Sequence, residues 1–232
     1  ARLLDYNDLD HDGLLMNDKA FLALRELLTD GGLRAGQFVS TSDLVKLIGL
    51  PLAPIREAVK RAESAGLVRV LPKRGVAVME ATPTIIRECF HLRTIFDQEG
   101  ARQLARRRPT DRLVALREQH QIILDAASIG ITASLQREAM AVDWQLHSAL
   151  TNVLDNASAS EIYARNRDRI LVIQHSRPLL PDRIVPAMSE HLAIINAIVD
   201  GDEQGAASQV HEHFRQTLRW WGIIDSPPKN SY

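Results

Sequence analysis

Four side chains in the second half of the sequence could share one metal ion. Asp143 and His147 lie four residues apart, so on a helix both project from the same face and can reach one cation. His191 lies in a later stretch of helical periodicity, within an apolar pattern that faces the interior of a bundle. The last such stretch offers either His211 or His213 as a further ligand. Three imidazoles and a carboxylate suit Zn²⁺, and also Ni²⁺, Fe²⁺ or Mn²⁺.

Other candidate sites have weaker patterns. The segment from Asp8 to Gly13 has oxygen-bearing residues at positions one, three and five and glycine at six, as in the opening of a calcium-binding EF-hand loop. The twelfth position is Lys19, a cation where the motif needs a bidentate Glu. We therefore interpret residues 1–17 as a flexible acidic arm. Cys89 and His91 are too close along one helix to form a nucleophilic pair, and no nucleophile elbow or phosphate loop is present.

Composition and charge limit the class of protein. The chain has 232 residues and a net charge of −1, but residues 17–80 carry ten basic against seven acidic side chains. This local excess suggests that one domain meets a polyanion. A single cysteine excludes an internal disulfide framework, and no apolar run of about 18 residues could span a bilayer. We expect a cytoplasmic protein that does not enter a membrane.

The basic part of the chain has the pattern of a winged helix-turn-helix. Apolar periodicity predicts a helix over residues 18–29, a second that starts at a cap within Ser40–Asp43 and ends at Gly49, and a third from the 51–54 region to residue 65. Residues 67–71 and 76–78 read as two strands joined by a basic turn. Three short helices and a hairpin wing predict a DNA-binding domain over residues 18–80.

The remainder shows only helical periodicity. Proline and glycine punctuation separates six expected helices, at residues 84–107, 111–128, 132–152, 157–175, 184–200 and 203–222. We expect an all-α six-helix bundle over residues 81–225, followed by a loose tail at 226–232. The fold is therefore mainly α.

Two family resemblances cover nearly everything after residue 18. The first half resembles the GntR family of regulators through an ordered set of motifs: Leu33 to Gly36, Gly49, Pro54-Ile55-Arg56-Glu57-Ala58, Gly66-Leu67-Val68 and Arg74-Gly75. The second half resembles the FCD ligand-binding domain of the FadR subfamily, with six helices as in the VanR-like branch. Its motifs are Leu92-Arg93, Ala101, Leu104-Ala105, Asp143-x3-His147, Asn156, Glu190-His191, and Asp202 followed eleven residues later by His213.

The resemblance implies a DNA-binding transcription regulator, usually a repressor, that is controlled by a small ligand. It implies that Asp143, His147, His191 and His213 bind one divalent metal, most simply zinc, and the family spacing alone selects His213 over His211. Arg93 occupies a position that faces the pocket in the family and could hold the carboxylate of an effector. Asn156 caps a helix or touches the site, with capping the favoured role. The alternative class is a metal-dependent hydrolase that uses the same four residues, but such an enzyme would not need the basic wing.

Double-stranded operator DNA is the expected partner, bound by a homodimer at two half-sites. The recognition helix, the wing and the start of the second helix supply the expected contacts: Arg56, Lys60, Lys73, Arg74, Ser40, Thr41 and Ser42. Arg56 could instead form a structural ion pair with a nearby carboxylate. Where the family often has Ser-Arg-Thr before the proline of the recognition helix, this chain has Pro51-Leu52-Ala53. This replacement removes an arginine that is well placed to read guanine.

Overall fold

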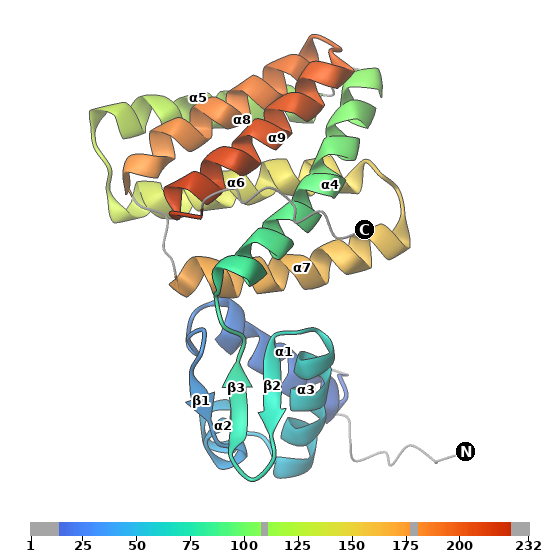
Figure 1. Cartoon of the computed structure of the whole chain (residues 1–232), viewed down its shortest axis with the longest axis vertical. Coiled ribbons are helices and arrows are strands. Elements are labelled where there is room, and N and C mark those ends of the chain that lie inside the picture. Colours follow the sequence, from blue (N-terminus) through green and yellow to red (C-terminus); the bar gives the residue numbers. More distant parts are fainter. Residues whose placement is uncertain (1–13, 108–110, 177–180, 224–232) are drawn as a thin grey trace, which may run out of the picture. The chain divides into compact units, whose positions relative to one another are not determined.

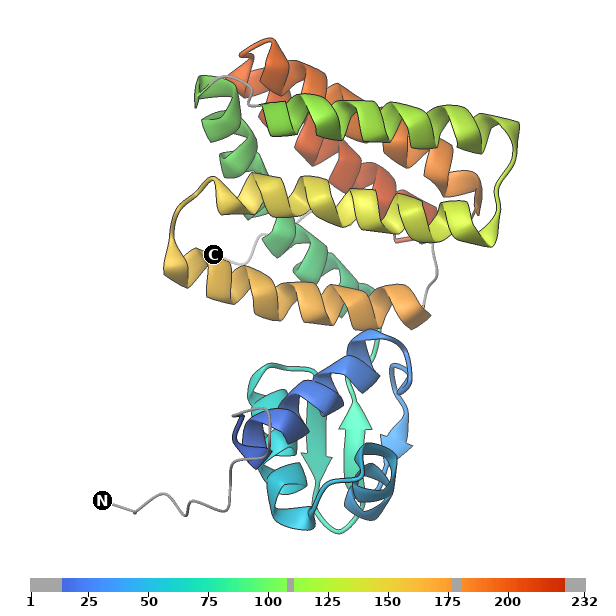
Figure 2. The same ribbon diagram turned by 180° about the vertical axis from the view of Figure 1, so that it is seen from behind.

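The computed structural model describes residues 14–107, 111–176 and 181–223 (Figure 1 and Figure 2). The chain divides into two compact units, and the division falls inside two long helices. Residues 1–86 and 167–177 belong to the first unit, and residues 87–166 and 178–232 belong to the second. The acidic segment from Asp8 to Gly13 and the tail at 226–232 lie outside the described residues.

Three short helices form most of the first unit, as predicted. They are α1 (Met16–Thr29), α2 (Thr41–Ile48) and α3 (Leu52–Ser64). Helix α2 begins within the predicted capping segment, and the cap is Ser40, whose side chain accepts a hydrogen bond of 3.0 Å from the backbone N–H of Asp43. It ends at Gly49, whose φ of 75° lies in the left-handed region that glycine tolerates best. Helices α1 and α3 pack on each other through their buried apolar faces.

A small antiparallel sheet completes the winged helix-turn-helix (Figure 1). The predicted hairpin is β2 (Val68–Leu71) with β3 (Gly75–Val78), and β1 (Phe38–Val39) adds to the other edge of β3. The sequence analysis missed β1, because two residues are too few for an alternating pattern. Gly75 has a φ of 101°, and a Cβ there would lie 2.7 Å from the carbonyl oxygen of Val39. Glycine at position 75 therefore lets β1 approach the hairpin.

The all-helical architecture predicted for the rest of the chain is confirmed for its described residues. The helices are α4 (Pro83–Arg107), α5 (Asp111–Ile129), α6 (Ala133–Asn152), α7 (Ala157–Ser176), α8 (Ile184–Val199) and α9 (Glu203–Trp220), and a short 3₁₀ turn, η2 (Pro181–Arg183), precedes α8. Their ends lie within two residues of the expected bounds. The turn η2 was not predicted. No helix in the described part of the chain combines the length and the apolarity that crossing a bilayer requires.

Helix α8 lies at the centre of the second unit. It packs against α5, α6 and α9, and it buries apolar side chains such as Met188, Ile194 and Ile195. Figure 2 shows α5 and α6 as antiparallel neighbours. Because the core forms where α5, α6, α8 and α9 meet, polar side chains that point inward from these helices are brought close together and shielded from water.

Helices α4 and α6 cross in direct backbone contact. At Gly100 of α4, a Cβ would lie only 1.7 Å from the carbonyl oxygen of Leu150 on α6, so no side chain fits there. Asp97 lies almost one turn before Gly100, and His147 lies almost one turn before Leu150. The crossing therefore holds Asp97 beside His147.

Candidate metal centre and DNA-binding surface

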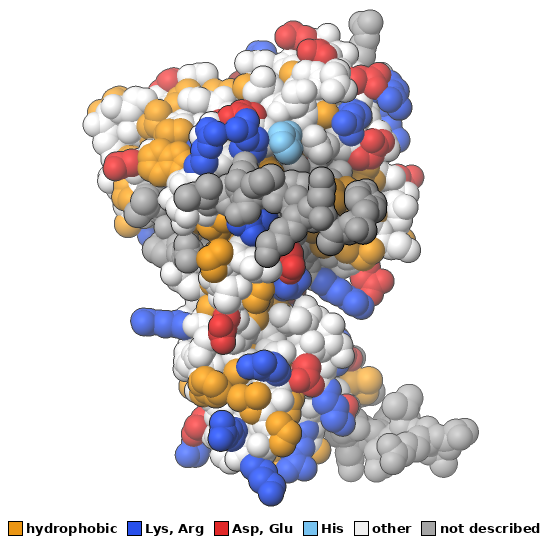
Figure 3. Space-filling model, viewed as in Figure 1, with side chains coloured by type: hydrophobic (Ala, Val, Ile, Leu, Met, Phe, Trp, Pro, Cys, Tyr) orange, Lys and Arg blue, Asp and Glu red, His pale blue; other side chains and the backbone are white. Residues whose placement is uncertain are grey.

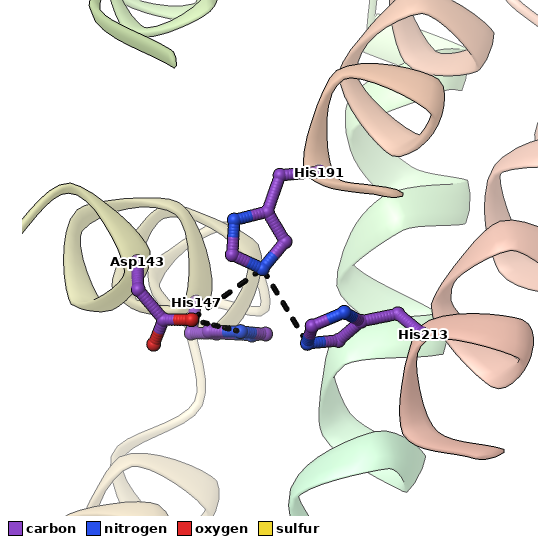
Figure 4. A group of neighbouring side chains, drawn as sticks. All are labelled: Asp143, His147, His191 and His213. Atoms are coloured by element: carbon purple, nitrogen blue, oxygen red, sulfur yellow. Dashed lines mark hydrogen bonds and ion pairs between the residues drawn. The ribbon is translucent and has the colours of Figure 1, made fainter. Parts of the chain in front are cut away.

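The structure brings the four predicted metal ligands together (Figure 4). Asp143 and His147 project from α6, His191 from α8 and His213 from α9, and their ligand atoms all lie within 4.8 Å of one another. The Nε2 atom of His191 lies 3.4 Å from Oδ1 of Asp143 and 3.4 Å from Nε2 of His213. Two ligands that share a tetrahedral zinc ion at its usual bond length are about 3.4 Å apart. The spacing of these atoms therefore suits a single ion.

Burial of the cluster supports a cation site. His147 and His191 are at most 1% exposed, and His213 is 4% exposed. Within the described residues, Nε2 of His147 and Oδ2 of Asp143 have no hydrogen-bond partner. A buried polar atom without a partner is costly, by about 1–3 kcal/mol. A divalent ion bound by these atoms would remove that cost, so the donor set fits a metal.

Two carboxylates, the buried Asp97 and the partly buried Glu190, hold two of the histidines in the orientation that a metal needs. Nδ1 of His147 donates to Oδ2 of Asp97 over 2.7 Å, and Nδ1 of His213 donates to Oε2 of Glu190 over 2.7 Å. Arg183 of η2 donates two hydrogen bonds to Glu190. Because Nδ1 carries the proton in each histidine, the lone pair of Nε2 faces the cluster. Such carboxylate partners are typical of metal-binding histidines.

Protonation states in the cluster also suit metal binding. Burial lowers the pKa of His147 and of His191 well below 6.5, so both are neutral at pH 7, and neutral imidazole is the ligating form. Burial raises the pKa of Asp97 to about 7, although the nearby Arg93 opposes this change. Burial alone would also raise the pKa of Glu190, but hydrogen bonds from His213 and Arg183 lower it. Glu190 is therefore an anion beside His213.

Arg93 is a buried residue of α4 rather than a solvated one. It is 3% exposed, and its Nε lies 3.6 Å from Oδ2 of Asp97. Its guanidinium carbon lies 4.8 Å from the ring centre of Phe90 and 5.9 Å from that of Trp144. Its charge contributes to the lowered pKa of His147, after burial. Arg93 thus lies beside the four side chains that could bind a metal, and its contact with an effector stays a prediction.

His120 of α5 is a further imidazole that the sequence analysis did not identify. Its ring centre lies 5.2 Å from that of His191, and burial lowers its pKa. Nδ1 donates to the carbonyl oxygen of Leu116 over 2.7 Å, because a carbonyl only accepts. Among the residues that the structure describes, Nε2 has no hydrogen-bond partner. His120 therefore adds a buried acceptor beside the cluster.

Two choices left open by the sequence can be compared with the structure. His211 is exposed and lies beside the ring of Phe214, whereas His213 belongs to the cluster. Asn156 caps α7, because its Oδ1 accepts a hydrogen bond of 3.0 Å from the backbone N–H of Ala159. Asn156 thus has the capping role that was favoured from the sequence.

The predicted DNA contacts of the recognition helix and the wing are exposed. Arg56 and Lys60 project from α3, and Lys73 and Arg74 lie in the turn between β2 and β3. Figure 3 shows lysine and arginine side chains around the hairpin end of the first unit. Lys60 pairs with Glu57 over 2.7 Å, but the structure contains no ion pair to Arg56 within its described residues. The ion-pair alternative for Arg56 therefore has no support in the structure.

The start of α2 is less open to a phosphate than the sequence indicated. Ser40 donates to Oδ2 of Asp43 over 2.6 Å, in addition to accepting from its backbone N–H. A phosphate can bind the Ser40 hydroxyl only after that hydrogen bond to Asp43 is broken. Thr41 is partly exposed and Ser42 is exposed.

Known protein families match both units. Residues 17–78 match the gntR family of bacterial regulatory proteins, and residues 88–216, more than half of the chain, match the FCD domain. The chain belongs to the gntR family. It is a DNA-binding transcription regulator of this family, in which a winged helix-turn-helix is followed by an FCD domain.

Two curated regulators are similar to this chain, one over most of its length and one over little more than a third. YdhC of Bacillus subtilis, an uncharacterized HTH-type transcriptional regulator, is 20% identical over 191 residues, which are 82% of this chain and 84% of YdhC. An uncharacterized HTH-type regulator of Agrobacterium vitis is 27% identical over 86 residues, and the match spans 37% of this chain and half of that protein.

Solved structures share the fold. E. coli McbR/YncC has a TM-score of 0.68 and 16% identity, covering 89% of this chain and 97% of that one. A putative transcriptional regulator GntR from Rhodococcus sp. RHA1 has a TM-score of 0.70 and 18% identity, and the match covers 90% of this chain and 99% of that chain.

The hydrolase alternative has no support in these comparisons, because the matching family is one of bacterial regulatory proteins. The geometry of this gntR-family protein also gives the hydrolase alternative no support. The two carboxylates beside the cluster, Asp97 and Glu190, already accept hydrogen bonds from His147 and His213. Neither is free to act as a general base.

Proposed function

We propose that this gntR-family regulator binds operator DNA as a homodimer and represses transcription, and that a small carboxylate effector controls its affinity for DNA. The effector would bind at a divalent metal ion in the FCD domain. The observation that carries the proposal is the convergence of four ligand atoms within 4.8 Å of one another, inside the domain that follows a DNA-binding unit.

Asp143, His147, His191 and His213 would hold the metal, most simply Zn²⁺, with Ni²⁺, Fe²⁺ or Mn²⁺ as alternatives. When bound, the ion supplies a positive charge that attracts an anionic ligand to its remaining coordination positions. Asp97 and Glu190 would keep His147 and His213 oriented, since each carboxylate accepts a hydrogen bond from Nδ1 of its histidine.

Arg93 would bind the carboxylate of the effector beside the metal. Its burial and its position next to Asp97 support this role, because a buried guanidinium gains more from an anionic partner than an exposed one does. In the present structure the Nε of Arg93 is 3.6 Å from Asp97, which is longer than a normal hydrogen bond. The guanidinium therefore retains capacity for a second anion.

DNA would be bound through Arg56 and Lys60 of the recognition helix and Lys73 and Arg74 of the wing, with Ser40, Thr41 and Ser42 near phosphates. One short recognition helix reads only a few base pairs, so a dimer that addresses two half-sites is the expected arrangement. Any change in DNA affinity caused by the effector would be reciprocal, because DNA must then alter the affinity for effector by the same factor.

Elemental analysis and calorimetry test the proposal. The purified protein should contain about one equivalent of a divalent metal, and acetate, succinate and citrate should be titrated as probes into wild type, His147→Ala and His191→Ala. We expect both variants to lose metal and to lose binding of any acid that binds wild type. His211→Ala is the matched control, because that histidine lies outside the cluster. A metal-free wild type, or acid binding that both variants retain, would contradict the mechanism and leave the DNA-binding assignment intact.

A further inference from the structure

The recognition helix α3 begins with apolar residues that are exposed. Leu52 is its first residue and is 44% exposed, and Pro51 and Ala53 on either side of it are exposed as well. The exposed residues further along the helix include Arg56, Glu57 and Lys60, which are all charged. A lone exposed leucine needs no explanation, but this one lies where helix-turn-helix proteins contact the edges of bases.

Apolar and cationic groups share one hollow at this point. A surface pocket of about 570 Å³ is lined by Leu52, Ala53 and Pro54 together with the polar or charged Asn17, Arg56, Glu57 and Lys60. Lys60 pairs with Glu57 over 2.7 Å at the exposed surface, a weak pair that a phosphate can replace, and Arg56 has no ion-pair partner among the described residues. The apolar groups therefore lie within one side chain's reach of cations that can bind phosphates. DNA offers the matching arrangement, because its phosphates flank a major groove in which one base carries an apolar group.

That base is thymine. Each base pair presents hydrogen-bonding groups in the major groove, and thymine adds its C5 methyl. The side chains of Pro51, Leu52 and Ala53 have no donor or acceptor, so they cannot pair with O6 or N7 of guanine and would leave those atoms without water or a partner. A thymine methyl makes no hydrogen bond to water that contact with these side chains would break, and burying its apolar surface favours binding.

We propose that Leu52 and Ala53 recognise the methyl group of a thymine in each half-site of the operator, while Arg56 and Lys60 hold the adjacent phosphates. This inference rests on the DNA-binding surface of the proposed function. Burying one methyl group should strengthen binding about fourfold, and two half-sites should give about 15-fold. A thymine at this position would thus set the sequence preference of the protein without a hydrogen bond.

Replacing thymine by uracil tests the proposal, because uracil lacks only the methyl group. The full chain is first used to select binding sites from random duplexes. Each thymine of the selected site is then replaced in turn by uracil, and dissociation constants are measured by fluorescence anisotropy. We expect one thymine per half-site to lose about fourfold in affinity on replacement. Leu52→Ala should bind the thymine and uracil duplexes with equal affinity. Leu52→Arg should select guanine in place of this thymine, because arginine pairs with guanine O6 and N7.

Leu22→Ala is the matched control, since Leu22 lies on α1 and is 46% exposed. It should keep the preference for thymine over uracil. The inference is wrong if no uracil replacement changes the affinity, or if Leu52→Ala still discriminates as wild type does. In both of those cases the protein still binds duplex DNA. A protein that binds no duplex at any salt concentration would overturn the DNA-binding surface itself, and this inference with it.

Discussion

Removing Arg56 and Arg74 together should flatten the salt dependence of DNA binding. Both side chains are exposed, one on the recognition helix and one in the wing, and neither has an ion-pair partner among the residues that the structure describes. No carboxylate of the described residues therefore competes with DNA for their charge. Each arginine that contacts a phosphate releases counterions, which makes the observed affinity fall as salt rises.

The size of the effect follows from the number of contacts. Each phosphate contact contributes about 0.9 to the slope of log affinity against log salt, so two arginines in each of two protomers contribute about 3.6. Between 50 and 200 mM salt, wild type should therefore lose about 150-fold more affinity than the Arg56→Ala, Arg74→Ala double variant. A single protomer on DNA would give only about half of that slope, so the same measurement reports the stoichiometry.

Fluorescence anisotropy of a labelled duplex at several salt concentrations measures this slope. Arg112→Ala with Arg137→Ala is the matched control, because it removes the same charge from exposed positions on α5 and α6. The control should keep the wild-type slope. An unchanged slope in the Arg56 and Arg74 double variant would refute the assignment of both residues to phosphates.

Three further predictions concern the candidate metal site. Glu190→Gln removes the anion between His213 and Arg183, so it should weaken Zn²⁺ binding about 10- to 100-fold, measured in competition with a chelator. An affinity equal to that of wild type would show that Glu190 does not support metal binding through His213. Removing the metal with EDTA should lower the melting temperature by about 10 °C if the free metal was at roughly 1,000 times its dissociation constant, as calorimetry can check. Burial lowers the pKa of His147 and His191 below 6.5, so below that pH the unfolded state binds more protons than the folded state. These two histidines should therefore destabilise the metal-free protein as the pH falls from 7 to 5, whereas Asp97, whose pKa is raised to about 7 in the folded state, opposes the change. Relative to wild type, His147→Gln with His191→Gln should therefore lose less stability between pH 7 and pH 5.

Capping residues, glycines, prolines and apolar periodicity predicted the bounds of the helices well. Ser40 and Gly49 mark the ends of α2, and the six later helices end where proline, glycine or a capping residue interrupts the apolar period. Strand β1 could not be predicted, because it forms only when the hairpin supplies a partner and Gly75 leaves room for it. Such pairing depends on residues almost 40 positions away in the sequence.

The cluster itself was predictable, but its supporting residues were not. Asp143 and His147 share a helix face by spacing alone, whereas Asp97 lies 50 residues from the histidine that it orients. An aspartate in a helix is usually a surface charge, and only the packing of α4 on α6 reveals that this one is buried. Arg93, four residues earlier, gave the one available signal, since it pairs with Asp97 along the same face.

The backbone contact at Gly100 limits how α4 can respond to a ligand. Because Gly100 touches the carbonyl oxygen of Leu150, sliding α4 along α6 would drive the side chains next to Gly100 into that backbone. Rotation about the contact would keep Gly100 against Leu150, so we expect α4 to pivot at Gly100 if it moves. Arg87 lies 13 residues from it, or about 20 Å along the helix, and each degree of rotation would move Arg87 by about 0.35 Å. A small displacement of Arg93 relative to the four candidate metal ligands would thus become a larger displacement toward the beginning of α4.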